Sequence, residues 1–107
     1  MGDDASCGTD AVYTELESLF SAWGGSAWLL QGQWGNRSVS ACNWHGIRCE
    51  GNNVTQIVLQ QNNLQGDVSA AKLPCISQTI VSLDVYGNEE LTGTLPVEWS
   101  AMHRLER

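Results

Sequence analysis

The stretch Val54-Thr55-Gln56-Ile57-Val58-Leu59-Gln60-Gln61-Asn62 decides how this chain folds, because its pattern of apolar residues and asparagine returns along the sequence. The second copy reads Ile80-x-x-Leu83-x-Val85-x-x-Asn88, and its asparagine lies 26 residues after Asn62. Self-similarity at such a period is typical of architectures in which each unit buries its apolar side against its neighbours. Residues 54–107 are therefore predicted to hold about two repeat units and a truncated third, which ends before its strand begins.

Each repeat is expected to start with a short strand, and the strands are expected to lie side by side in a parallel sheet. Side chains alternate along a strand, so one set faces the core and the other faces away from it. The inward set is Ile57, Leu59, Leu83 and Val85. The exposed row is Gln56, Val58, Gln60, Ser82, Asp84 and Tyr86. This row is a candidate protein-binding face, since tyrosine is enriched at binding hot spots; the alternative is an ordinary solvated surface.

Asn62 and Asn88 follow the two predicted strands and are expected to turn the chain away from the sheet. A buried amide has both donors and acceptors, so it can satisfy backbone groups of its own turn and of the neighbouring unit. We interpret both asparagines as structural and not as catalytic amides. Gly66 and Gly93 follow them at positions where the backbone can take conformations closed to other residues.

Residues 1–53 are predicted to form a separate N-terminal cap. A helix is expected over about residues 10–23, where Val12, Leu16, Leu19, Phe20 and Trp23 make one apolar stripe. Thr9 or Asp10 is expected to cap this helix, Glu15 and Glu17 to lie on its wetter side, and Gly24-Gly25 to end it. The turn-rich segment that follows holds Trp28, Trp34 and Trp44, which we interpret as a compact apolar plug.

The four cysteines are Cys7, Cys42, Cys49 and Cys75. An even number in a short chain indicates two disulfides if the protein is exported. Cys42 and Cys49 are the natural local pair, which leaves Cys7 with Cys75 by elimination. The alternative is a metal site at Cys42-x-x-His45-x-x-x-Cys49, but the second pair of ligands that zinc sites commonly have is missing. No metal or other cofactor is predicted.

The charge balance and the lack of long apolar runs argue against two classes of function. The 107 residues carry 12 acidic and 5 basic side chains, a net charge of −7. This balance argues against nucleic-acid binding, which needs a basic surface, and no apolar run is long enough for membrane insertion. The chain shows no signal peptide at its start. Asn36-Arg37-Ser38 and Asn53-Val54-Thr55 are glycosylation motifs in predicted turns.

Taken together, the helix, Trp34, Cys42-x-Trp44-x-Gly46-Ile47-x-Cys49 and Val54-Thr55-x-Ile57-x-Leu59 resemble the N-terminal cap and first repeat of plant-type leucine-rich-repeat proteins. The resemblance covers residues 10–107 and supports the Cys42–Cys49 pair. It implies an α/β fold: a right-handed leucine-rich-repeat solenoid with a helical, disulfide-bonded cap and short parallel strands on its concave face. Residues 91–102 also resemble a repeat of surface antigens and proteophosphoglycans of kinetoplastid parasites, which implies a secreted or cell-surface location.

The sequence therefore predicts an extracellular or cell-surface module that binds a protein ligand, such as a host or receptor protein, at the capping end of a surface antigen or adhesin. The alternatives are a fragment of a plant-type receptor or inhibitor, and a purely structural cap. An enzyme is not predicted, because the sequence holds no recognised nucleophile or metalloprotease motif. Self-association is expected at an uncovered C-terminal edge, which would be bordered by Leu95, Trp99, Met102 and Leu105.

Overall fold

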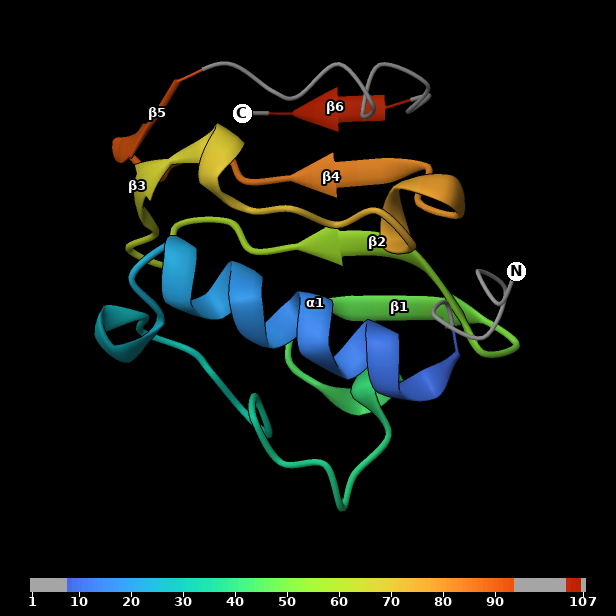
Figure 1. Ribbon diagram of the computed structural model, residues 1–107. Coiled ribbons are helices and arrows are strands. Elements are labelled where there is room, and N and C mark those ends of the chain that lie inside the picture. The colour runs from blue at the N-terminus through green and yellow to red at the C-terminus, as the bar shows by residue number, and fades with distance from the viewer. Residues whose placement is uncertain (1–7, 94–103, 107) are drawn as a thin grey trace.

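The computed structural model describes residues 8–93 and 104–106, with one helix and two small sheets (Figure 1). The helix α1 spans Thr9–Ala22, and four short 3-10 helices follow: η2 (Gly25–Ala27), η3 (Ala41–Asn43), η4 (Val68–Ala70) and η5 (Ile76–Gln78). The strands are β1 (Ile47–Glu50), β2 (Asn53–Val58), β3 (Gln65–Asp67), β4 (Ser82–Asp84), β5 (Glu90–Thr92) and β6 (Arg104–Glu106). Within the described ranges, no helix is both long and apolar enough to span a membrane.

The larger sheet has the strand order β1-β2-β4-β6, and Figure 1 shows these strands stacked one above the other with α1 running along the strand direction. The hairpin β1–β2 is antiparallel, whereas β2, β4 and β6 are parallel. Ile57 lies opposite Leu83, so equivalent positions of the two repeats are neighbours in the sheet. The smaller parallel sheet pairs β3 with β5, so the chain segments that follow Asn62 and Asn88 also lie side by side.

The third repeat was predicted to end before its strand, and this prediction is wrong. Strand β6 pairs with β4, and Leu105 lies opposite Leu83. Leu105 follows Leu83 by 22 residues, four fewer than the interval from Ile57 to Leu83. The return segment is thus shorter than in the preceding repeat, so the next strand starts before the chain stops. Leu95, Trp99 and Met102 of the predicted open edge lie outside the described residues.

Helix α1 begins one residue earlier than predicted and is capped differently. Its N-cap residue is Gly8, which has no side chain, and not Thr9 or Asp10, so the predicted cap is wrong. The last residue of the helix is Ala22 and its C-cap is Trp23. As expected, the chain then turns at Gly24, whose φ of 71° lies in the left-handed region that glycine tolerates. Three members of the predicted stripe, Leu16, Leu19 and Trp23, are fully buried.

Two kinds of side chain build the core. In the repeats, the inward positions Ile57, Leu59, Leu83 and Val85 are all buried, as their spacing predicted. In the cap, rings pack on rings: the centroids of Trp28 and Trp34 are 5.0 Å apart, and those of Trp34 and Trp44 are 5.3 Å apart. The indole N–H groups donate to backbone carbonyls, for example that of Trp44 to Asn36 O at 3.2 Å. The three tryptophans are therefore packing residues and not an exposed aromatic surface.

Candidate functional site: the outer face of the sheet

The candidate site is the face of the β2–β4 pair that points away from the core. Parallel pairing places Gln56 beside Ser82 and Val58 beside Asp84. Just beyond the strands, Gln60 donates from its side-chain amide to Asp84 Oδ2. The Tyr86 backbone N–H donates to Asp84 Oδ1 at 3.2 Å. The structure thus brings the six residues of the predicted row together on one surface.

The six residues are not equally exposed, and here the prediction needs correction. Ser82 and Asp84 were expected on the surface, but only 8% and 9% of their surface is exposed. Both lie on β4, which has β2 on one side and β6 on the other. Their side chains are short, and Gln60 reaches over Asp84 from the neighbouring turn. A ligand can therefore meet Asp84 only through the groups bonded to it.

The accessible part of the face is smaller than the predicted row. Gln56 and Val58 are half-buried, Gln60 is exposed, and Tyr86 shows 57% of its surface to solvent. Tyr86 is held at its backbone, because its carbonyl also accepts the N–H of Gln61 at 2.8 Å. An aromatic ring on a fixed backbone loses little conformational freedom when it binds a partner. Among the six residues of the row, Tyr86 is the aromatic one, and it is exposed.

The asparagine turns hold this face in position. The Asn88 carboxamide accepts from the N–H groups of Asn62 and Leu64 at 2.8 and 3.0 Å. It donates to the carbonyls of Leu59 and Val85 at 2.8 and 2.7 Å. One buried side chain therefore ties the second repeat to the first.

Asn62 occupies the equivalent position in the first repeat, but its partner is the cap. Its carboxamide accepts from Leu30 N–H at 2.6 Å and donates to Leu30 O at 2.7 Å. The Leu29 N–H donates to Asn62 O at 3.3 Å. The segment at residues 29–30 thus takes the place that a preceding repeat turn would occupy.

The cysteines at the hairpin form a disulfide. The sulfur atoms of Cys42 and Cys49 are 2.09 Å apart, and the bond joins η3 to β1. Neither sulfur is therefore a thiolate that could act with His45 as a metal ligand. Cys75 is also disulfide-bonded. Cys7, its predicted partner, lies outside the described residues, so this pairing stays a prediction.

The glycosylation motif at Asn36 lies on an exposed turn, as predicted, but Asn53-Val54-Thr55 opens strand β2, so the prediction of a turn there is wrong. Asn36 is exposed; its amide donates to Gln33 Oε1 at 3.1 Å and its carbonyl oxygen accepts from Ser38 N–H at 3.0 Å. Asn53 is exposed at the start of β2, and Thr55 donates to Arg48 O at 3.3 Å. Neither asparagine belongs to the outer face of β2 and β4 described above.

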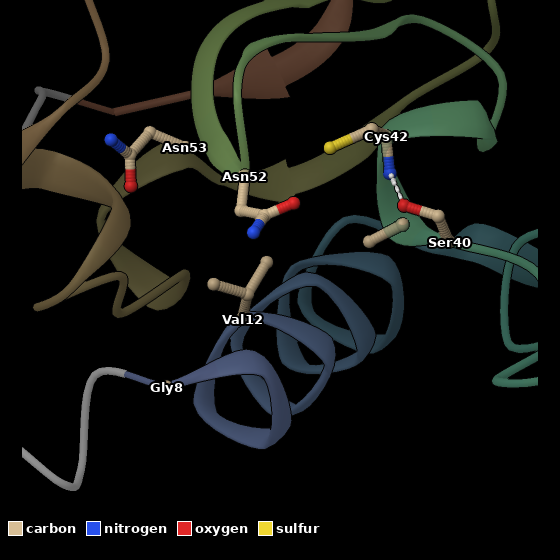
Figure 2. A pocket seen from close by; sticks show the side chains of 7 residues that line it. Gly8, Val12, Ser40, Cys42, Asn52 and Asn53 are labelled. Carbon is tan, nitrogen blue, oxygen red and sulfur yellow. Dashed lines mark hydrogen bonds between the residues drawn. The ribbon is translucent and has the colours of Figure 1, made fainter.

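A shallow hollow lies between the start of α1 and the β1–β2 hairpin (Figure 2). It has a volume of about 270 Å³ and is lined by Val12, Ser40, Cys42, Asn52 and Asn53, among others. The Asn52 amide lies above Val12 in Figure 2, and Ser40 accepts the backbone N–H of Cys42 at 3.2 Å. The described residues that line the hollow supply amides and a hydroxyl, and none of them has an acidic or basic side chain that could act as a general acid or base.

Sequence reasoning missed the role of Glu15. It was assigned to the wetter side of the helix, but Glu15 is buried, and its carboxylate accepts the backbone N–H groups of Cys75 and Ile76 at 2.9 and 3.0 Å. The carboxylate therefore satisfies amides that lead into η5, some 60 residues along the chain. The two partner amides are distant in sequence, so no local signal could have revealed them.

The other helix carboxylate is on the surface, as expected. Arg37 donates to both oxygens of Glu17, at 3.0 and 2.8 Å, and its guanidinium lies 5.3 Å from the centre of the Tyr13 ring. The hydrogen bonds from Arg37 lower the pKa of Glu17 below its ordinary value. Farther along, the N–H and hydroxyl of Ser69 lower the pKa of Asp67, which caps η4. Among the described residues, Glu17 thus bonds to Arg37 and Asp67 to Ser69, and these contacts order turns.

Comparison with known proteins adds one relative. No family model matches the chain. Over 96 residues, 90% of its length, the chain is 35% identical to a probable inactive receptor kinase of Arabidopsis thaliana. It spans only 14% of that protein's length. The match supports the plant-type part of the resemblance and not the kinetoplastid part.

Proposed function

We propose that this chain is the capping end of an extracellular leucine-rich-repeat receptor module that binds a protein ligand. In this proposal residues 1–53 close the end of a right-handed solenoid, and residues 54–107 supply its first repeats. The in-register strands β2, β4 and β6 support the solenoid, as do the equivalent positions of Asn62 and Asn88. The bonds between Asn62 and Leu30 support the capping role, because the terminal unit of a solenoid must cover its open end.

The observation that carries the binding function is the surface made by Val58, Gln60 and Tyr86. It combines an exposed aromatic ring with a half-buried aliphatic side chain and the exposed side chain of Gln60. Rigid aromatic residues beside adaptable polar groups are typical of protein-binding surfaces. The buried Asp84 orients Gln60 and the Tyr86 backbone, so this surface exists before a ligand arrives.

The extracellular location is supported by the disulfides and by the relative. A receptor kinase has a kinase part and a receptor part, and this chain contains neither the H-R-D nor the D-F-G motif of kinases. Its disulfides are of the kind that persist in oxidising compartments. We therefore place the chain in a receptor part, as a binding module and not an enzyme. Asn36 and Asn53 are proposed as N-glycan acceptors, to be tested by glycosidase-sensitive mass shifts in Ser38→Ala and Thr55→Ala variants.

The binding function is tested by screening the multimerised chain against a library of extracellular proteins. We expect a ligand whose affinity falls more than about tenfold in Tyr86→Ala, as for hot-spot residues. The matched control is Val81→Ser, which alters an exposed apolar residue outside the Val58, Gln60 and Tyr86 surface. If ligand binding survives both Tyr86→Ala and Val58→Ser, the surface made by Val58, Gln60 and Tyr86 is not the ligand site. If no ligand is captured at all, the chain is a structural cap.

A further inference from the structure

A second surface lies at the edge where β2 and β4 end, on the far side of the molecule from the β1–β2 turn (Figure 1). There a groove of about 470 Å³ is lined by Leu29, Gln61, Asn63, Gly87, Glu89 and Glu90, together with Asn88. We call it the edge groove. It excludes Val58, Gln60 and Tyr86, so its function does not depend on the binding surface proposed above.

The apolar side of the edge groove is unusual for a surface loop. Leu29 exposes 70% of its surface, and its neighbour Leu30 exposes 58%. Neither is on a loose loop, because the backbone N–H groups of both residues donate to Asn62. Holding two leucines in water on a fixed backbone keeps an apolar contact ready for a partner.

The lining of the edge groove also includes two acidic side chains. Glu89 and Glu90 are both exposed, and within the described residues no Lys or Arg side chain forms a salt bridge with either. The chain as a whole carries a net charge of −7, so its field favours a cationic partner at this edge. The two carboxylates and Leu29 together are complementary to a segment that presents lysine or arginine next to an aliphatic side chain.

The floor of the groove is rigid. Gln61 and Asn63 have φ values of 49° and 62°, which non-glycine residues seldom adopt. The Asn88 side chain fixes the backbone around them through its bonds to Asn62 and Leu64. Gly87 closes against Gln61, since a Cβ at Gly87 would lie 2.5 Å from Gln61 Cγ. A partner would therefore bind a groove that is already formed.

From these observations we propose that the edge groove binds an extended peptide segment in which basic and aliphatic residues alternate. The aliphatic side chain packs on Leu29, and the flanking basic side chains pair with Glu89 and Glu90. An extended segment suits the groove because its successive side chains point to opposite sides. The edge groove would then be a second binding site of the module, separate from the surface made by Val58, Gln60 and Tyr86.

The test uses the full 107-residue chain and a short synthetic peptide that alternates leucine and lysine. Fluorescence anisotropy measures affinity, and amide NMR shifts map the contact. We expect shifts at Leu29, Gln61 and Glu90, and an affinity about tenfold weaker in Leu29→Ser and in the double variant Glu89→Gln/Glu90→Gln.

Two controls separate the groove from the net charge of the chain. The double variant Asp10→Asn/Glu50→Gln removes the same number of charges at exposed positions outside the groove, and it should change affinity less than about twofold. A peptide with serine in place of leucine should bind more weakly than the leucine peptide. Equal losses in both double variants, or shifts confined to other surfaces, would overturn the proposal. Thermal melting of each variant excludes misfolding as the cause.

Discussion

The cap and the repeats fill their cores with different kinds of side chain. In the repeats, aliphatic side chains at fixed spacing fill the core, and one asparagine per unit satisfies the turn. In the cap, the turn-rich segment between α1 and β1 is held by packed rings, indole hydrogen bonds and a disulfide. Repetition lets the same bonds be made in each unit, whereas the cap must cover one end once and has no equivalent neighbour. The predictions below test how separate these two parts are.

The largest effect is expected in the aromatic core of the cap. Trp44→Ala removes a fully buried indole that lies 5.5 Å from the Tyr13 ring and bonds to Asn36 O. Losing a buried tryptophan costs about 3–5 kcal/mol of unfolding free energy. Chemical denaturation with tryptophan fluorescence measures it. A loss below about 1 kcal/mol would mean that the ring cluster does not hold the cap together.

The second prediction compares the two asparagines. Asn88→Ala leaves two N–H groups and two carbonyls of the turns without their partner, and should cost about 3 kcal/mol. Asn62→Ala removes two bonds, both to Leu30, and should cost about 2 kcal/mol. Denaturation of both variants under one condition ranks them. The reverse order would show that the contact between cap and repeat matters more than the contact between repeats.

A smaller loss is expected where the cap helix meets the repeats. Glu15→Gln keeps the size of the side chain but presents an NH₂ group to one of the backbone N–H donors of Cys75 and Ile76. The variant should lose about 1–2 kcal/mol, because a charge-assisted bond is replaced and one amide is left poorly satisfied. Relative to the natural chain, Glu15→Gln should speed amide hydrogen exchange at Ile76 more than at Leu83. Unchanged exchange at Ile76 would contradict a capping role for Glu15.

The smallest effect concerns the surface pair of Glu17 and Arg37. The pKa of Glu17 is lowered in the folded chain, so the pair contributes stability above the ordinary glutamate range and loses it as the pH falls through the lowered pKa. Because both side chains are substantially exposed, this contribution is small and screened by salt. The stability difference between the natural chain and Glu17→Gln should be positive at neutral pH and should disappear as the pH falls through the lowered pKa of Glu17. A difference that persists in acid would point to packing and not charge.

The repeats were more predictable than the cap, for a physical reason. A spacing of alternating apolar residues followed by asparagine specifies which side chains face the core, since strand geometry leaves little freedom. The burial of Ile57, Leu59, Leu83 and Val85 followed from this rule alone. The burial of Ser82 and Asp84 did not follow from this rule. It depends on which strands flank β4 and on the contact that Gln60 makes with Asp84.

By itself, the sequence determined the repeat register, the inward residues, the local Cys42–Cys49 bond and the end of α1 just before Gly24. These depend on residues near one another in the chain or on strict periodicity. Only the tertiary structure decided that Glu15 caps the turn at Cys75, that residues 29–30 stand in for a repeat turn, and that Leu29, Glu89 and Glu90 line one groove. Each of these joins segments far apart in sequence, whose approach is set by packing of the whole core and not by any local preference.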